Sequence, residues 1–285
     1  MAVKVGIPIG DLDAVTAVAV AEEADRVGFD SVWVPEHLVM PVAASGTPFG
    51  GDAHPEIPSA TPFLDPFVLL AHLAARTRHI RLATHVFNIG LRHPFTTARA
   101  VSTLDVVSEG RVDFAVGASW LAEEWDAVGI PFSSRGRRVD EALAVCRRLW
   151  TEPVIEHHGE FFDFGPVMFE PKPVQRPAPP LHVGGDGPAA LRRAARIGEG
   201  WVPMNHRLDE LHAPIARMAE LRAAAGRDGR VEVTFWGPAR GPADFARYAE
   251  AGVDRVLTRP WRRGEDPVTG VRRFAERLLP AAAAA

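Results

Sequence analysis

The sequence has one cysteine, no apolar run long enough to cross a membrane and only a small excess of negative charge. The single cysteine, Cys146, cannot form a disulfide within the chain, and its position among helix-forming residues predicts a buried, unreactive thiol. The chain enters a strand-like segment with no preceding signal peptide, so we expect a cytoplasmic protein with no membrane partner. A net charge of −4 gives no basic surface for nucleic acid.

The 285 residues, 47% of them apolar, can bury a large core, and we expect one domain spanning residues 1–285. Short apolar runs typical of strands alternate with longer segments that have helical caps and spacing. The expected strands are residues 3–9, 31–34, 80–87, 111–116, 181–183, 200–202, 231–236 and 255–257. The expected helices are residues 13–27, 66–77, 94–108, 134–150, 188–197, 209–225, 242–251 and 268–279, followed by a frayed alanine tail. Eight strand–helix units in series predict an α/β fold, a (β/α)8 TIM barrel.

Two segments interrupt this alternation. Residues 39–65, which follow the second strand, are dense in Gly, Pro and Ser, and a loop of this length predicts a lid or a binding loop. Residues 151–180 contain seven prolines and predict an insertion before the fifth strand, with a hairpin near His158-Gly159. The aromatic run Phe161–Phe164 within this insertion is expected to help close over a substrate.

The carboxyl ends of the strands form the working face of such barrels. Here they carry glycines, aromatic rings and neutral polar groups, and few carboxylates. They comprise Glu36 and His37, residues 85–88, 117–120, 184–187 and 204–206, and Arg259 with Trp261. Metal centres in barrels need several His and acidic ligands, and neither His-x-His nor His-Glu-x-x-His spacing occurs, so we expect no metal site.

Several of these residues have two interpretations. The turn from Gly184 to Pro188 joins a strand to a helix, which suits a phosphate or simply a tight turn, and an inward Asp186 carboxylate would repel phosphate. Taken alone, His37 is better explained by an imidazole bound to a backbone carbonyl at the barrel rim. The residues Trp120, Trp125 and Trp261 suit either core packing or a flat aromatic ligand. The cations Arg135, Arg137 and Arg138 oppose the dipole of the helix they begin, which predicts an anionic partner.

Four stretches together resemble the luciferase-like superfamily of oxidoreductases that use flavin or the deazaflavin coenzyme F420. They are residues 21–37, 79–94, 109–141 and 182–201. The Trp-Leu-x-Glu-Glu element at residues 120–124 and the Arg-Gly-x-Arg element at residues 135–138 are most similar to the actinobacterial branch predicted to use F420.

The resemblance implies a tricyclic cofactor ring at the strand mouths, a phosphate near the Gly184 turn and a cis peptide at His85-Val86. It implies that His37 is the catalytic base of an acid–His pair with Glu36. Some relatives carry a catalytic Glu at the position of Trp120, so that acid/base set is incomplete here and sugar-phosphate chemistry is not expected. The implied cofactor-binding residues are Glu36, His85, Val86, Asn88, Gly117, Ala118, Ser119, Trp120, Glu123, Gly184, Gly185, Gly187 and Pro188.

The favoured function is F420-dependent hydride transfer to or from a small, largely apolar organic substrate, for which the cofactor supplies the chemistry. One alternative is an FMN-dependent monooxygenase that uses O2 and takes reduced flavin from a partner reductase. A second alternative is a barrel that binds flavin without turnover. The resemblance also suggests a homodimer, and an F420 or flavin reductase as a partner.

Overall fold

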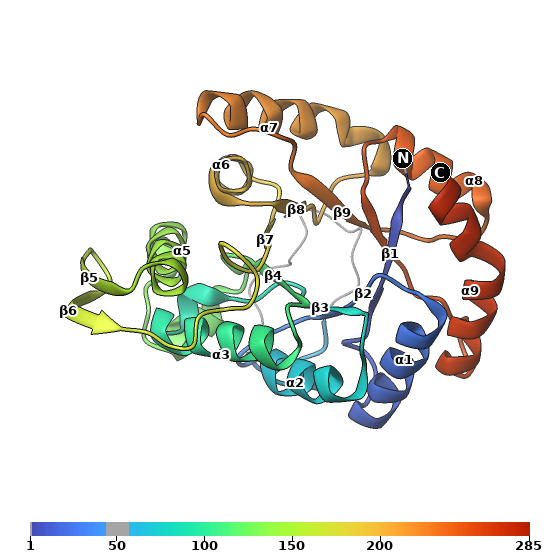
Figure 1. The fold of residues 1–285 in the computed structure, drawn as a ribbon, viewed down its shortest axis with the longest axis horizontal. Coiled ribbons are helices and arrows are strands. Elements are labelled where there is room, and N and C mark those ends of the chain that lie inside the picture. The colour runs from blue at the N-terminus through green and yellow to red at the C-terminus, as the bar shows by residue number, and fades with distance from the viewer. Residues whose placement is uncertain (1, 44–56) are drawn as a thin grey trace.

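The computed structural model describes residues 2–43 and 57–285, so part of the expected lid loop, residues 44–56, lies outside the described residues. Within the described chain, eight parallel strands close into a barrel in the order β1-β10-β9-β8-β7-β4-β3-β2 (Figure 1). The strands are β1 (Lys4–Pro8), β2 (Ser31–Val34), β3 (Arg81–Thr84), β4 (Val112–Val116), β7 (Leu181–Gly184), β8 (Gly200–Val202), β9 (Glu232–Trp236) and β10 (Arg255–Leu257). The predicted (β/α)8 barrel is confirmed.

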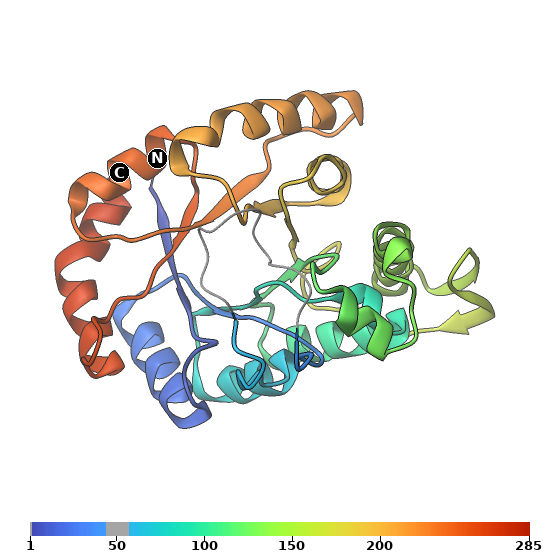
Figure 2. The ribbon, with the colours of Figure 1, turned by 180° about the vertical axis from the view of Figure 1, so that it is seen from behind.

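Helices surround this barrel on its outer side, and the ring is visible from both faces (Figure 1, Figure 2). The first helix shows why the sequence signals worked: Asp13 accepts hydrogen bonds from the amides of Val15 and Thr16, and Gly28 ends the helix with φ 91°. The helices are α1 (Ala14–Val27), α2 (Pro66–Arg76), α3 (Pro94–Val107), α4 (Ala122–Ala127), α5 (Arg135–Thr151), α6 (Pro188–Ile197), α7 (His212–Ala224), α8 (Pro242–Glu250) and α9 (Pro267–Ala284). Short 3₁₀ turns are η1 (Ile89–Leu91), η2 (Phe132–Ser134) and η3 (Leu208–Glu210).

Three features differ from the sequence-based expectations. The third strand ends at Thr84 and not at residue 87. The peptide His85-Val86, which follows it, is cis, and this agrees with what the resemblance implied. Helix α4 was not expected. The alanine tail is not frayed, because α9 continues to Ala284 and the carbonyl of the buried Ala282 accepts a hydrogen bond of 2.9 Å from the amide of Val3.

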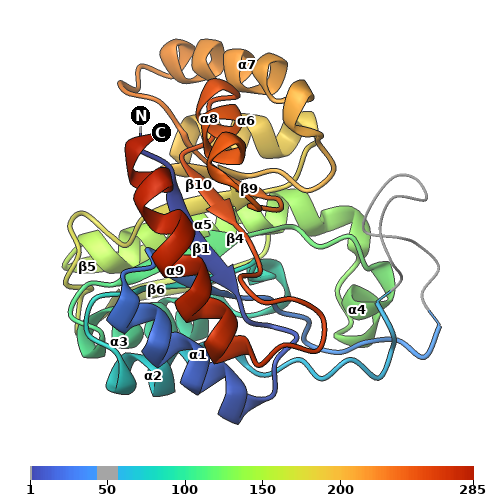
Figure 3. The same ribbon diagram turned by 90° about the vertical axis from the view of Figure 1, so that its right-hand side faces the viewer.

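The insertion forms the predicted hairpin from β5 (Val154–His158) and β6 (Asp163–Met168). Its turn is held by Glu141 of α5, which accepts hydrogen bonds from the amides of Phe161 and Phe162. The buried Phe162 ring packs against His93, with the Arg138 guanidinium 4.6 Å from its centroid. The expectation that Phe161–Phe164 closes over a substrate is not met, because these rings are engaged by α3 and α5. Figure 3 shows the hairpin extending away from the end of the barrel where α4 lies.

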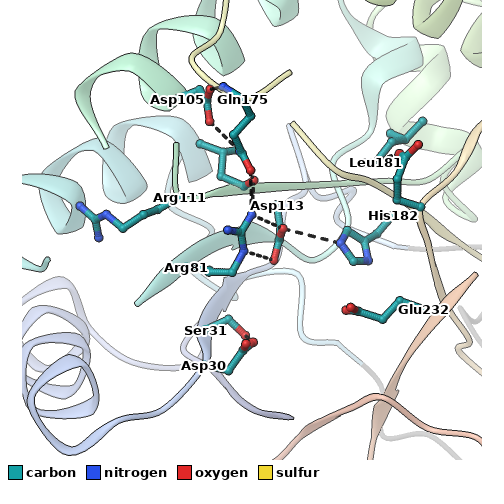
Figure 4. A network of polar contacts seen from close by, with 12 residues as sticks. Asp30, Ser31, Arg81, Asp105, Arg111, Asp113, Gln175, Leu181, His182 and Glu232 are labelled. Atoms are coloured by element: carbon teal, nitrogen blue, oxygen red, sulfur yellow. Dashed lines mark hydrogen bonds and ion pairs between the residues drawn. The ribbon is translucent and has the colours of Figure 1, made fainter. Parts of the chain in front are cut away.

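The amino ends of the strands hold a buried network of charges. The Arg255 guanidinium, at the start of β10, is 1% exposed and contacts Asp30 at 2.6 Å, Glu232, and Asp113 at 3.6 Å. Arg81 at the start of β3 contacts the same Asp113 carboxylate, with a shortest distance of 2.6 Å (Figure 4). Buried charges are tolerated only when they are paired in this way, and the network closes the base of the barrel.

The pKa of Asp113 shows that the surrounding positive and hydrogen-bonding groups outweigh the effect of burial. Burial alone would raise the pKa of this carboxyl. The His182 imidazole, with Nε2 3.8 Å from the carboxylate, and the guanidiniums of Arg255 and Arg81 outweigh burial and hold the pKa below its usual range. With the base filled by side chains, ligand chemistry is expected at the opposite end, where the strands finish.

Candidate active site at the carboxyl ends of the strands

The acid–His pair follows β2 and reaches the loop that follows β3. The Glu36 carboxylate is 5% exposed, accepts a hydrogen bond of 2.9 Å from the amide of Asn88 and contacts Arg92 at 2.6 Å. Burial raises the pKa of Glu36, and the charge of Arg92 offsets only part of that effect. Glu36 is therefore fixed against the loop after β3.

The His37 imidazole sits in an aromatic frame, with its side chain 9% exposed. The Phe63 ring meets it edge-on at 5.0 Å and the Trp120 ring at 5.8 Å. Its Nδ1 lies 3.3 Å from Glu124 Oε2, at the long end of the hydrogen-bond range. The partner of His37 among the described residues is thus a carboxylate, rather than the backbone carbonyl that the sequence alone favoured.

Glu124 joins the ends of three strands, whereas the sequence indicated only a cofactor contact or a helix cap for it. It is fully buried on α4 and accepts hydrogen bonds from the amide of Leu38, from Ser119 Oγ at 3.2 Å and from Asn88 Nδ2 at 3.4 Å. The signal in the sequence was the Glu124-Trp125 pair, because a carboxylate next to a core tryptophan is expected to need partners. Its neighbour Glu123, which the resemblance placed at the cofactor, lies half-buried on the same helix.

The small residues of this wall are explained first by packing. A Cβ atom at Gly117 would lie 2.6 Å from Val86 Cγ2, and one at Gly184 would lie 2.9 Å from Val86 Cγ1. Both glycines therefore leave room for the side chain that follows the cis peptide. Ala118 and Ser119 continue the wall, and Ser119 has a left-handed φ of 56°. Strained backbone of this kind concentrates at functional sites.

The Gly184 turn presents the first turn of α6 to solvent. The Asp186 carboxylate accepts hydrogen bonds of 2.9 and 3.0 Å from the amides of Met204 and Asn205, so it does not cap α6. Gly185 adopts φ 112°, and Gly187 and Pro188 are exposed. The Asp186 carboxylate is thus engaged by the loop after β8, although it directly precedes Gly187 at the start of α6.

An aromatic surface lies on the other side of the mouth. The His85 ring stacks on Trp236 with centroids 5.7 Å apart, and meets Trp33 edge-on at 5.8 Å. Burial lowers the pKa of His85 to about 4, so its imidazole is neutral near pH 7. Trp236, at the end of β9, is 50% exposed. The sequence-based prediction of the site did not include this residue, because it placed no site residue at the end of β9.

Other residues singled out from the sequence have partners elsewhere. Trp125 is core, and Trp261 packs on Gly270 of α9. Arg137 finds its anionic partner in Glu160 at 2.8 Å. The neighbouring Arg135 lies over the ring of Phe132, and Arg138 donates a hydrogen bond to the carbonyl of Gly90.

In the part of the chain that the structure describes, no group of three or more His, Cys, Asp or Glu side chains is arranged to hold a metal ion. Among the same residues, no helix has the length and apolar character needed to cross a membrane.

Comparison with known proteins agrees with this architecture. An uncharacterised protein of Mycobacterium tuberculosis is 36% identical over 267 residues, which cover 93% of this chain and 94% of that protein. An F420-dependent secondary alcohol dehydrogenase, solved with an F420-acetone adduct, is similar in fold with a TM-score of 0.81 at 20% identity, covering 99% of both chains. The monooxygenase RslO1 of Streptomyces bottropensis has a TM-score of 0.78 at 24% identity, covering 97% of this chain and 99% of that one.

The family model described as luciferase-like monooxygenase matches residues 9–256, which begin just after β1 and include every later barrel strand except the last residue of β10. The chain therefore belongs to the luciferase-like monooxygenase family.

Proposed function

We propose that this protein is an F420-dependent oxidoreductase that transfers hydride to or from a small, largely apolar organic substrate. The observation that carries the proposal is the placement of His37. Its ring stands at the strand mouths between Phe63 and Trp120, with one nitrogen directed to a buried carboxylate. A positioned imidazole is the commonest general acid or base, and it suits the proton that accompanies hydride exchange with an alcohol or ketone.

The residues at the mouth fit a flat tricyclic cofactor. Such a ring needs apolar or aromatic walls and close approach of backbone, which Trp236, Val86 and residues 117–119 offer. The exposed start of α6 offers the backbone amides of Gly187 and Ala189 and a helix dipole to a phosphate, while Pro188 contributes no donor. When bound, F420 supplies the hydride chemistry. This chain would orient the reactants, exclude water and hold or move a proton at His37.

The rim of the mouth favours an apolar substrate. Large apolar side chains that are more than a third exposed gather at the ends of the strands and on the loops that follow them. A single exposed apolar side chain is ordinary, but a group of them marks a binding surface. The exposed side chains at this rim are Leu38, Val39, Leu64, Met204 and Trp236. We propose that the loop of residues 39–65, which contains Val39 and Leu64, covers the bound substrate.

Titration of the purified protein with F420 and with FMN tests the proposal. We expect F420 to quench intrinsic tryptophan fluorescence at micromolar concentration and FMN to bind more weakly. Tight FMN binding without F420 binding would refute the F420 assignment.

A His37→Ala variant tests the role of the imidazole. It should keep its F420 affinity and lose turnover by about 10²–10⁴-fold, the usual contribution of a general acid or base. His212→Ala, at an exposed histidine on α7, is the matched control and should behave as the wild type. If neither the wild type nor His37→Ala turns over any member of a broad panel of alcohols and ketones, a barrel that binds its cofactor without catalysis would be favoured.

An FMN-dependent monooxygenase is the second candidate, favoured by the likeness in fold to RslO1. The same walls accept either tricyclic ring, so the discriminating observation is oxygen. Uptake of O2 that requires both reduced FMN and substrate would replace the first proposal with this one. A reductase that delivers reduced cofactor would then be a required partner.

We further propose that residues 1–285 form one domain and that the protein is a cytoplasmic homodimer. Light scattering coupled to size-exclusion chromatography measures the oligomeric state. A monomer at micromolar concentration would contradict the dimer.

A further inference from the structure

We propose that Glu124 is a positioning residue that fixes the tautomer of His37 and leaves Nε2 as the nitrogen that faces the reaction. The proposal deepens the proposed function of the same site. It starts from four polar groups that surround one buried carboxylate among the described residues and come from the loops after β2, β3 and β4.

Each of these four groups is able to donate a hydrogen bond to the carboxylate. The amide of Leu38 is a donor by its nature, and Asn88 presents its Nδ2. The hydroxyl of Ser119 accepts from the amide of Leu121 at 3.2 Å, which frees its proton for Glu124. An ionised carboxylate only accepts, so the fourth neighbour, His37 Nδ1, must carry its proton to take part.

This arrangement decides which imidazole nitrogen is available. A neutral imidazole has one N–H and one lone pair, and the bond made by one nitrogen sets the state of the other. With the proton at Nδ1, the lone pair lies at Nε2. Glu124 is 0% exposed, so water does not compete for the bond that sets this choice.

The same geometry predicts the effect of exchanging the carboxylate for an amide. In Glu124→Gln, one oxygen becomes an NH2 group that must avoid other donors. The amide of Leu38 cannot turn away, because it belongs to the backbone, so the remaining oxygen is expected to stay with it. The NH2 group then faces His37 Nδ1, which can accept only if the proton moves to Nε2. The tautomer of His37 should therefore invert.

Nitrogen-15 NMR of histidine-labelled, cofactor-free protein reads the tautomer directly, at a pH where the imidazole is neutral. The His37 signals are assigned with His37→Ala. We expect the proton at Nδ1 in the wild type and at Nε2 in Glu124→Gln. The matched control is Asp126→Asn, the same exchange at an exposed carboxylate on α4, which should leave the wild-type pattern.

Steady-state kinetics give the second measurement. Glu124→Gln should lower kcat by about 100-fold or more while the Kd for F420 changes less than about threefold, because an imidazole with its proton on Nε2 cannot accept one there.

The outcomes separate this inference from the proposed function. Identical tautomers in the wild type and Glu124→Gln would overturn the positioning role, whether or not F420 is turned over. An inverted tautomer in a protein that does not bind F420 would support the positioning role and reject the F420 assignment. If Glu124→Gln does not fold, the wild type alone decides, since a proton at Nε2 there would overturn the inference.

Discussion

Replacing Arg255 by methionine should destabilise the protein by about 3–5 kcal/mol at pH 7, the usual cost of removing one partner from a buried ion pair. The guanidinium is almost fully buried and contacts Asp30, Asp113 and Glu232. Methionine fills similar space, so the expected loss comes from the uncompensated carboxylates and not from a cavity. The loss is a large share of the 5–15 kcal/mol by which domains are ordinarily stable.

The pH dependence identifies the cause. Burial raises the pKa values of Asp113 and Glu232, but Arg255 and the other nearby cations outweigh it and hold both below the usual range. Groups with depressed pKa values contribute stability that is complete above about pH 4–5 and is lost as the pH falls through the folded-state values. Arg255→Met forfeits that contribution, so its deficit should stay near its pH 7 value down to about pH 4–5 and should shrink as the pH falls below that range.

Urea unfolding at pH 7 and at about pH 3, followed by tryptophan fluorescence, measures both effects. The control is Arg217→Met, which breaks an exposed pair with Glu220 and should change the stability by less than about 0.5 kcal/mol. A loss below about 1 kcal/mol at pH 7, or a deficit that grows in acid, would refute the reasoning.

Three further predictions concern single residues. Glu23 joins α1 to α9 through arginines that lower its pKa to about 2. The Glu23→Gln variant should therefore be less stable than the wild type by about 1 kcal/mol at neutral pH, and a difference in urea midpoint that persists near pH 2 contradicts this. Burial raises the pKa of Cys146, so a thiol reagent should label the protein only after denaturant is added; rapid native labelling contradicts it. Gly117→Ala should cost about 1–3 kcal/mol by displacing Val86, measured as a lower thermal midpoint than that of Gly136→Ala, where a Cβ meets no neighbour.

The barrel was predictable because its signals are local. Each parallel strand is covered on both faces, so it reads as a short apolar run whatever its position in the chain. Helix boundaries followed from caps such as Asp13 and Gly28, whose hydrogen bonds lie within a few residues. The hairpin near Gly159 was also visible from the chain alone. Its anchor to Glu141 was not, because that contact joins residues 20 apart.

Helix α4 gave no comparable signal. It has only six residues, and Leu121 before it makes no side-chain cap. Its direction depends on Trp125, which is buried by tertiary packing that periodicity does not reveal over so short a segment. The prediction that the alanine tail is frayed was wrong because the order of the tail depends on a contact with Val3, which is distant in the sequence.

The missed helix changes the argument about acid/base chemistry. Comparing residues one by one with relatives, Trp120 stands where a catalytic carboxylate is expected, which suggested an incomplete set. The structure brings Glu124, four residues later, to within 3.3 Å of His37 Nδ1, because α4 folds back over the end of β4. Trp120 meanwhile supplies an edge of the aromatic frame around the same imidazole. Trp120 thus packs against His37, and Glu124 supplies the carboxylate beside it. The absence of a carboxylate at position 120 is therefore no argument against proton transfer at this site.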